Sequence, residues 1–298
     1  MTTLRETIRQ TTAAHLDAGH MVMGQCLSAV GWVGGTLPER HDMTELPMAD
    51  VAGAGFAVGA ALAGRRPIYV IRYQGFGWLN LPLIVNYAAK SKALWGVPCP
   101  MLIRSIAMEG GIGPVAGSSH HALLYRMPGV RIYAPMTPGE WRAAYQEFMA
   151  GDDVVYLSEH RGAYGEEYEF IPSLIWEGRP DISIFAVSIT RKAAAEASAA
   201  LYAQDGPRVS VHHIWRLKPF APSHEALNDL ARSERGIVLD DDYPDGVAKA
   251  IAHDLHVATG ARMHVMGLPE RTAGFAPWAD VLPPDAEAIK AEVRRLLA

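Results

Sequence analysis

Residues 51–73 read VAGAGFAVGAALAGRRPIYVIRY, in which small and apolar residues give way, after two arginines, to β-branched and aromatic ones. Apolar side chains lie on most faces of residues 51–63 if they are helical, which predicts a buried helix. Residues 67–73 predict a strand, because β-branched and aromatic side chains favour an extended backbone. The rest of the chain repeats this succession of helix and strand.

The same alternation extends in both directions from this segment. Further helices are expected at residues 3–16, 81–95, 137–150, 191–204, 223–232, 246–259 and 285–297. Further strands are expected at residues 98–104, 130–134, 153–158, 182–187, 209–215, 236–239 and 263–266. Strands that alternate with helices of about 10–15 residues predict mainly parallel sheets with helices on both faces. The expected fold class is therefore α/β.

The length and one interruption of the pattern predict two domains. The 298 residues exceed the range of about 100–200 residues that is usual for one domain. The periodicity lapses at residues 170–181, where two prolines also occur, and we interpret this segment as a linker. We expect residues 1–169 and residues 182–298 to form separate domains, each with a mainly parallel sheet flanked by helices.

The composition excludes several classes of protein. Hydrophobic residues make up 49% and charged residues 20% of the chain, with a net charge of −5, which is typical of a globular protein rather than a disordered one. Such a charge argues against sequence-wide electrostatic binding of nucleic acid. The polar N-terminus has no signal-peptide pattern, and no apolar run reaches the ~18 residues of a membrane span. A cytoplasmic protein without membrane contact is expected.

The cysteines and the glycine-rich segments do not indicate a disulfide framework, a zinc site or a phosphate-binding loop. Cys26 and Cys99 are too few for a disulfide framework or a multi-cysteine zinc site; they fit a reducing compartment and are interpreted as buried thiols. The sequence has neither a P-loop nor a G-x-G-x-x-G motif that opens a helix after a strand. The glycine-rich residues 110–113 are interpreted as a turn, because Pro114 follows them rather than a helix.

A set of segments, all in one order, resembles the β subunit of thiamine-diphosphate-dependent 2-oxoacid dehydrogenase E1 components. The segments that carry the resemblance are residues 23–25, 46–64, 66–68, 84–90, 128–130, 134–138, 154–161 and 215–220. The wider group includes transketolases, which combine a diphosphate-binding, a pyrimidine-binding and a C-terminal domain. This chain resembles the last two domains over nearly its whole length. The resemblance implies a pyrimidine-binding domain at residues 1–169 and a transketolase C-terminal-like domain at residues 182–298.

The resemblance also implies a partner. The family's diphosphate and metal motif, Gly-Asp-Gly followed at a distance by Asn, does not occur in this sequence. An α-type subunit is therefore expected to supply the ligands of the diphosphate and of Mg²⁺, so no metal ligand is assigned here. Shared active sites imply an α2β2 heterotetramer. The small residues Gly55 and Gly59 form a strip that we expect to lie against a neighbouring chain.

Asp50 stands at the position that the resemblance makes most important. In the family a glutamate hydrogen-bonds to a ring nitrogen of the cofactor's pyrimidine and favours the imino tautomer that deprotonates the thiazolium carbon. Counting back from residues 55–59 places Asp50 there, with a side chain one methylene shorter. The alternative is that Asp50 caps the helix that begins at Val51.

Aromatic and cationic residues complete the implied site. Tyr73 and Phe76 resemble the aromatic pair that transketolase-like enzymes place against the aminopyrimidine, with packing in the core as the alternative. His120 and His121 resemble the histidines that face the substrate, and either could donate to a developing alkoxide. Arg161 matches an arginine near the anionic end of the substrate, with a surface role as the alternative.

Three further residues bear on the site. The short stretch between His120 and Pro128 leaves open which histidine faces the substrate. Gln25 replaces a glutamate of E1 β subunits. His212 and His213 lie in a predicted strand of the second half and are interpreted as structural.

The resulting hypothesis is the pyrimidine-binding subunit of a two-subunit enzyme that cleaves a 2-oxoacid or a ketose and transfers the acyl or ketol unit. One alternative is the C-terminal half of a split transketolase that acts on ketose phosphates, which the His-His pair favours, whereas residues 51–64 and 84–90 favour E1. A second alternative is a scaffold subunit that has lost the proton relay, because Asp50 replaces the glutamate.

Overall fold

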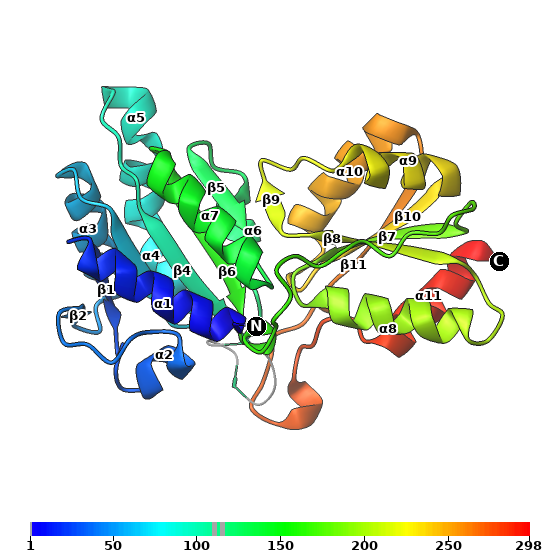
Figure 1. Ribbon diagram of the computed structural model, residues 1–298, viewed down its shortest axis with the longest axis horizontal. Coiled ribbons are helices and arrows are strands. Elements are labelled where there is room, and N and C mark those ends of the chain that lie inside the picture. Colours follow the sequence, from blue (N-terminus) through cyan, green and yellow to red (C-terminus); the bar gives the residue numbers. More distant parts are fainter. Residues whose placement is uncertain (1, 109–111, 114–116) are drawn as a thin grey trace.

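The computed structural model describes residues 2–108, 112–113 and 117–298. Within them, two mainly parallel β-sheets lie side by side and are flanked by helices (Figure 1), which confirms the predicted α/β class. The first sheet has the strand order β2-β1-β3-β4-β6-β5-β9, and every neighbouring pair is parallel except β5 and β9. The second sheet is wholly parallel, with the order β11-β10-β7-β8.

The strands of the first sheet are β1 (Met21–Gln25), β2 (Thr44–Leu46), β3 (Pro67–Ile71), β4 (Leu102–Ala107), β5 (Val130–Tyr133), β6 (Val154–His160) and β9 (Arg216–Lys218). Its helices are α1 (Leu4–Asp17), α2 (Gly31–Gly35), α3 (Asp50–Leu62), α4 (Gly77–Leu83), α5 (Ala89–Trp95), α6 (Ala122–Tyr125) and α7 (Pro138–Ala150). The second sheet has β7 (Ile182–Val187), β8 (Val209–Ile214), β10 (Arg235–Leu239) and β11 (Arg262–Met266). Its helices are α8 (Thr190–Tyr202), α9 (His224–Ser233), α10 (Val247–Thr259) and α11 (Ala286–Leu297).

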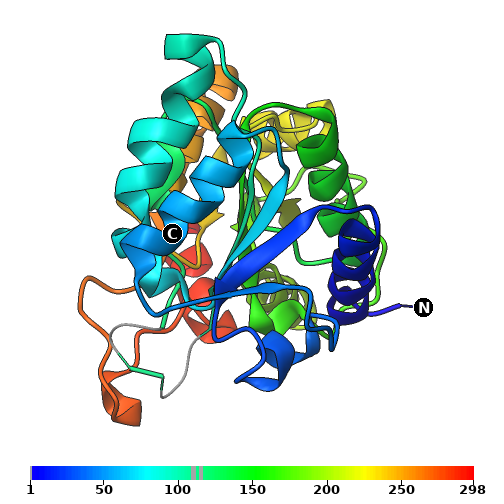
Figure 2. The same ribbon diagram turned by 90° about the vertical axis from the view of Figure 1, so that its left-hand side faces the viewer.

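Helices cover both faces of each sheet. Figure 2 shows α3, α4 and α5 on one face of the first sheet, with α1 and α7 on the other. The second sheet lies between α8 and α11 on one side and α9 and α10 on the other (Figure 1). Every residue of β3, β4, β6 and β7 is buried, as parallel strands between two layers of helices require. Among the described residues, no helix combines the length and the apolar character that a membrane span needs.

One strand of the first sheet comes from beyond residues 170–181. β9 follows β8 directly in the chain, yet it pairs antiparallel with β5 at the edge of the first sheet. The core beneath it is shared, because Leu217 of β9 packs in the same buried cluster as Ile132 of β5 and Phe185 of β7. The two sheets are therefore joined by a continuous apolar core as well as by the chain.

Several boundaries differ from the prediction, and prolines explain two of them. The helix expected at residues 81–95 is divided into α4, a π-helical turn (Ile84–Ala88) and α5, with Pro82 inside α4. Proline lacks the N–H that a regular helical bond needs, and a π-helical turn adjusts the following register. The strand expected at residues 98–104 begins only at Leu102, because Pro98 and Pro100 cannot donate ladder hydrogen bonds. The short strands β1, β2 and β9 were not predicted.

Helix α3 is not buried on all sides, which corrects the prediction of a buried helix. Its inner face packs in the core through Ala54, Ala57 and Ala61. On its outer face, Phe56 is 61% and Val51 is 50% exposed in this chain. A helix that is apolar all round but covered on one side leaves a surface that another protein can bury.

A buried ion pair lies between two central strands of the first sheet. Arg104 on β4 donates through Nε to Glu159 Oε1 at 2.7 Å and through Nη2 to Oε2 at 2.9 Å, and both side chains are almost fully buried. Thr36 accepts from Arg104 at 2.9 Å, and the Tyr164 hydroxyl donates to Glu159 at 3.2 Å. A buried ion pair of this kind is stable only while both members are present, because removal of one leaves the other charge buried and uncompensated.

We predict that Arg104→Ala lowers the free energy of unfolding by about 3–5 kcal/mol, because it leaves the Glu159 carboxylate buried and unpaired. The matched control is Arg9→Ala, which removes an exposed pair with Glu6 and should cost less than about 1 kcal/mol. Urea unfolding followed by circular dichroism measures both variants. Equal losses in the two variants would contradict the prediction.

Candidate functional site

The predicted site residues lie where parallel strands end. Tyr73 follows β3, His120 follows β4 after residues 108–119, and Arg161 follows β6. In the second sheet, Asp240 follows β10 directly. Loops at the carboxyl ends of parallel strands are where α/β folds form their sites, because these ends meet at one edge.

A pocket at this edge brings together three of the predicted residues. Asp50, Tyr73 and Phe76 all line it, together with Gln25 and Cys26 at the end of β1. These residues come from three elements, β1, α3 and the turn after β3, and Gln25 and Phe76 are 51 positions apart in the chain. The pocket therefore joins a carboxylate, two aromatic rings and an amide.

Asp50 is the first residue of α3 and not its N-cap. The N-cap position belongs to Ala49, where no side-chain hydrogen bond caps the helix, so the alternative interpretation of Asp50 as the cap is wrong. Instead, Asp50 Oδ1 accepts from Asn80 Nδ2 at 3.3 Å. Asn80 is itself held, because its Oδ1 accepts from the Tyr69 hydroxyl at 2.6 Å and its Nδ2 also donates to Phe76 O at 2.9 Å. The carboxylate is thus oriented by a buried amide.

Gln25 carries an unused hydrogen-bond donor into the same pocket. Its Nε2 is buried and has no hydrogen-bond partner among the described residues. Since buried polar atoms are nearly always paired, such an atom in a pocket wall fits a ligand with an acceptor. Cys26 beside it is only half-buried, which corrects the prediction of two buried thiols, whereas Cys99 is buried as expected.

Tyr73 lies between an aromatic ring and two guanidinium groups. Its ring centroid is 6.1 Å from that of Phe76, and the two ring planes meet at 54°. The guanidinium carbons of Arg72 and Arg161 lie 4.9 and 5.3 Å from the Tyr73 centroid. Burial raises the pKa of Tyr73, but the two positive charges lower it by more, so this pKa lies below its ordinary value.

Arg161 keeps donors available beside this ring. Its Nε and Nη2 atoms are buried and have no hydrogen-bond partner among the described residues. Guanidinium donors in this state suit a carboxylate or phosphate, which can accept two parallel hydrogen bonds.

Gln74 organises the centre of the site, and the sequence analysis missed it. Its side chain is fully buried, donating through Nε2 to Ser158 Oγ at 2.7 Å and to Ser105 O at 3.2 Å. Its Oε1 accepts the His120 backbone N–H at 2.6 Å. One amide therefore connects the ends of β3, β4 and β6 with the histidine segment. A polar residue directly after a buried strand was the signal that could have identified it.

The two neighbouring histidines have different surroundings. His120 is partly exposed, its ring stacks on Tyr243 with centroids 6.4 Å apart, and burial lowers its pKa. His121 is fully buried, with Nδ1 3.2 Å from Ser158 Oγ and Nε2 2.9 Å from Asp240 Oδ1. The glycine-rich turn that was predicted just upstream falls largely outside the described residues.

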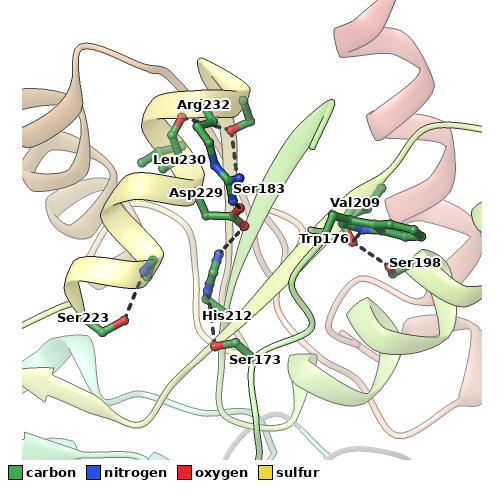
Figure 3. A network of polar contacts seen from close by, with 12 residues as sticks. Ser173, Trp176, Ser183, Ser198, Val209, His212, Ser223, Asp229, Leu230 and Arg232 are labelled. Carbon is green, nitrogen blue, oxygen red and sulfur yellow. Dashed lines mark hydrogen bonds and ion pairs between the residues drawn. The ribbon is translucent and has the colours of Figure 1, made fainter. Parts of the chain in front are cut away.

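Figure 3 shows a separate polar network in the second sheet. His212 lies between Ser173 Oγ, 3.3 Å from Nδ1, and Asp229 Oδ2, 3.0 Å from Nε2. Asp229 also accepts from Arg232 at 2.6 Å. Both ring nitrogens of the buried His212 are engaged, as in a structural histidine. His213 pairs through Nε2 alone, with Glu140 of α7 3.2 Å away, and so links the two halves; its buried Nδ1 has no hydrogen-bond partner among the described residues.

Comparisons with known proteins identify the family of the chain. The family model described as "Transketolase, pyrimidine binding domain" matches residues 8–167. The β subunit of acetoin:2,6-dichlorophenolindophenol oxidoreductase from Cupriavidus necator is 26% identical over 277 residues, which cover 86% of this chain and 80% of that protein. The β subunit of the pyruvate dehydrogenase E1 component from Rickettsia bellii is 29% identical over 69% of this chain and 66% of that protein.

A solved structure has the same fold along the whole chain. It is described as a split gene transketolase in an inactive β4 tetramer, and it matches with a TM-score of 0.76 at 16% identity. The match covers 100% of this chain and 99% of that one, so both sheets and their relative arrangement recur there.

We predict that Arg161→Gln raises the pKa of Tyr73, because it removes one of the two positive charges that stabilise the phenolate. Ultraviolet titration measures phenolate formation, and subtraction of the curve of the matching Tyr73→Phe protein isolates this single group. Arg65→Gln, which changes an exposed arginine on another loop, is the control and should leave the curve unchanged. An unchanged Tyr73 titration in Arg161→Gln would show that the guanidinium has no electrostatic influence on the ring.

Proposed function

Since this chain belongs to the transketolase pyrimidine-binding domain family and is an E1 β-like subunit, we propose that it forms the pyrimidine-binding half of a thiamine-diphosphate-dependent enzyme. The enzyme cleaves the carbon–carbon bond next to the carbonyl of a 2-oxoacid and transfers the acyl unit. The pocket that unites Asp50, Tyr73, Phe76 and Gln25 is the observation that carries this proposal. We assign the pyrimidine-binding role to residues 1–169 and a C-terminal role to residues 182–298.

The pocket fits an aminopyrimidine in three respects. Two aromatic rings offer faces for a flat heterocycle, and a carboxylate can accept or hold a proton at a ring nitrogen. The unpartnered Gln25 Nε2 can donate to a further acceptor on the ring. When bound, thiamine diphosphate supplies an electron sink for the bond that is cleaved.

Asp50 is the residue that we propose to hold the proton. It is the acidic residue in the first turn of α3, so the start of that helix fixes the place of its carboxyl group in the pocket. Its hydrogen bond from Asn80 fixes one carboxylate oxygen. A shorter side chain than glutamate is compatible with this role if the start of α3 lies close to the ring.

His120 and Arg161 are proposed to face the substrate. Arg161 has two buried, unpartnered donors that can pair with an anionic group. His120 is the partly exposed member of the histidine pair, and its lowered pKa keeps the ring neutral, with one N–H that can donate to a developing alkoxide. His121 is buried and directed towards Asp240, so we assign it no direct contact with substrate.

An α-type partner is proposed to supply the diphosphate and Mg²⁺ ligands, because the sequence has no motif for them. The uncovered apolar surface of this chain supports such a partner. Large apolar side chains exposed on and next to α3, α4 and α5 are Met48, Val51, Phe56, Trp78, Leu79, Tyr87, Leu94 and Trp95. Patches of this kind mark protein interfaces. We propose an α2β2 assembly in which α3 contributes to the contact.

Two alternatives are separated by assays of the complex. A split transketolase would turn over ketose phosphates rather than 2-oxoacids, and the fold shared with the split gene transketolase is consistent with this alternative. A scaffold that has lost the relay would support binding of thiamine diphosphate without exchange of its C2 proton. Assaying the assembled pair of subunits against 2-oxoacids and ketose phosphates distinguishes the two enzymes.

We predict that Asp50→Asn lowers the rate of C2 proton exchange and turnover by about 10²–10⁴-fold in the assembled complex, because asparagine keeps the size but loses the charge. Nuclear magnetic resonance of quenched exchange reactions measures the C2 proton. Asp17→Asn, at an exposed position on α1, is the matched control and should have no effect. Near-normal exchange in Asp50→Asn would rule out Asp50 as the proton holder.

We also predict that Phe56→Asp weakens association with the partner by about tenfold or more, because it places a charge in a buried apolar contact. Val257→Asp is the matched control, since Val257 is 70% exposed on α10 of the second sheet. Sedimentation of each variant with the partner measures association. The proposed contact through α3 would be wrong if both variants assembled like the unmodified chain.

A further inference from the structure

A second group of polar residues lies at the contact between the two sheets. His121 precedes α6 in the first half, and Asp240 and Asp241 follow β10 in the second half. All three side chains are fully buried. One potential ligand atom from each residue lies within 4.8 Å of the other two. The cluster is distinct from the pocket of Asp50 and Tyr73, none of whose lining residues belongs to it.

Most polar atoms of the three side chains in this cluster have partners, and His121 is engaged through both ring nitrogens, with Nε2 2.9 Å from Asp240 Oδ1. His121 Nδ1 contacts Ser158 Oγ at 3.2 Å, and Asp241 Oδ2 accepts from Ser119 at 2.7 Å. Asp240 Oδ1 accepts the Asp242 backbone N–H at 3.2 Å. The buried oxygens that have no partner among the described residues are Asp240 Oδ2 and Asp241 Oδ1. Buried polar atoms are rarely unpaired, so two such oxygens on neighbouring carboxylates can accommodate a ligand.

The charge of the cluster indicates that this ligand is a cation. Three successive buried carboxylates, from Asp240 to Asp242, face His121. His160 also lies close enough to Asp241 to act on it electrostatically, and its Nδ1 accepts the Gly162 N–H at 3.0 Å. Three buried carboxylates beside this imidazole carry an excess of negative charge, which burial disfavours unless protons or a further cation compensate it.

We propose that His121, Asp240 and Asp241 bind a divalent transition-metal ion, Zn²⁺ or Mn²⁺, that links the two sheets. One imidazole and two carboxylates are a donor set for these ions, whereas Mg²⁺ and Ca²⁺ prefer oxygen donors alone. Ligand atoms about 2.0–2.2 Å from Zn²⁺ lie about 3.3–3.5 Å apart, so the three ligand atoms, which lie within 4.8 Å of one another, would have to move closer together around an ion. The hydroxyl groups of Ser158 and Ser119, which contact His121 and Asp241, would then fix the orientation of these two ligands.

Asp242 differs from its two neighbours in a way that provides a control. Its Oδ2 accepts the Ala122 N–H at 2.9 Å, and its Oδ1 accepts the Tyr243 N–H at 2.7 Å. Both of its oxygens are therefore used by backbone donors. Asp242 adds negative charge beside the site but is not a ligand in the proposal.

The experiment uses the full chain without thiamine diphosphate, which separates this site from the proposed cofactor. The chain is treated with a chelator, and Zn²⁺ or Mn²⁺ is then added and unbound metal removed by gel filtration. We expect about one ion per chain by elemental analysis, a higher Tm on metal addition and no competition from Mg²⁺. Asp241→Asn should weaken binding at least tenfold, as measured against a chromophoric chelator, whereas Asp242→Asn should retain the ion.

Each contrary result overturns the proposal. If the unmodified chain binds neither ion and its Tm does not move, the cluster is held by protons and the imidazolium alone. If Asp241→Asn binds as tightly as the unmodified chain, the metal lies elsewhere. If Asp241→Asn does not fold, the unmodified chain still decides the question. Its Tm shift should disappear on chelation and return when metal is added again, and a Tm that stays constant through both treatments overturns the proposal.

Discussion

The contact between His121 and Asp240 joins the two halves of the molecule at the place where both of their sheets end. His121 Nε2 lies 2.9 Å from Asp240 Oδ1, and Ser119 and Ala122 on either side of this histidine bond to Asp241 and Asp242. The loops at the carboxyl ends of parallel strands carry polar groups that burial would otherwise leave unpaired. Because polar groups in the loops of one sheet pair with polar groups in the loops of the other, the two sheets are held with these edges in contact.

The proposed active site is built from the same loops. Gln74, which supports the His120 backbone, also bonds to Ser158, and Ser158 contacts His121. A continuous series of buried hydrogen bonds therefore runs from the end of β3, beside Tyr73, to the aspartates that follow β10. Placement of the histidine pair depends on both sheets, so residues 117–121 cannot be understood from the first half alone. This connection gives the second half a structural part in the site even though it lines none of the aromatic pocket.

The outer face of α3 shows the opposite situation, in which the chain leaves a surface uncovered. Asp50 begins this helix inside the pocket, while Phe56, less than two turns further on, faces outward. A partner that covers Phe56 would therefore also lie close to the pocket. The same helix thus connects the proposed interface with the proposed cofactor site.

The sequence by itself determined the class of fold and most of its elements, because the periodicity of apolar residues is a local property. The short strands β1, β2 and β9 were not predicted, because three to five residues are too few to show an apolar periodicity. In addition, β9 is defined only by its pairing with β5. Resemblance located Asp50, Tyr73 and Phe76, and the fold placed them in one pocket. Only the tertiary structure revealed the cluster of His121 with Asp240 and Asp241. Its members are about 120 positions apart, and no local pattern encodes which loop end will meet which.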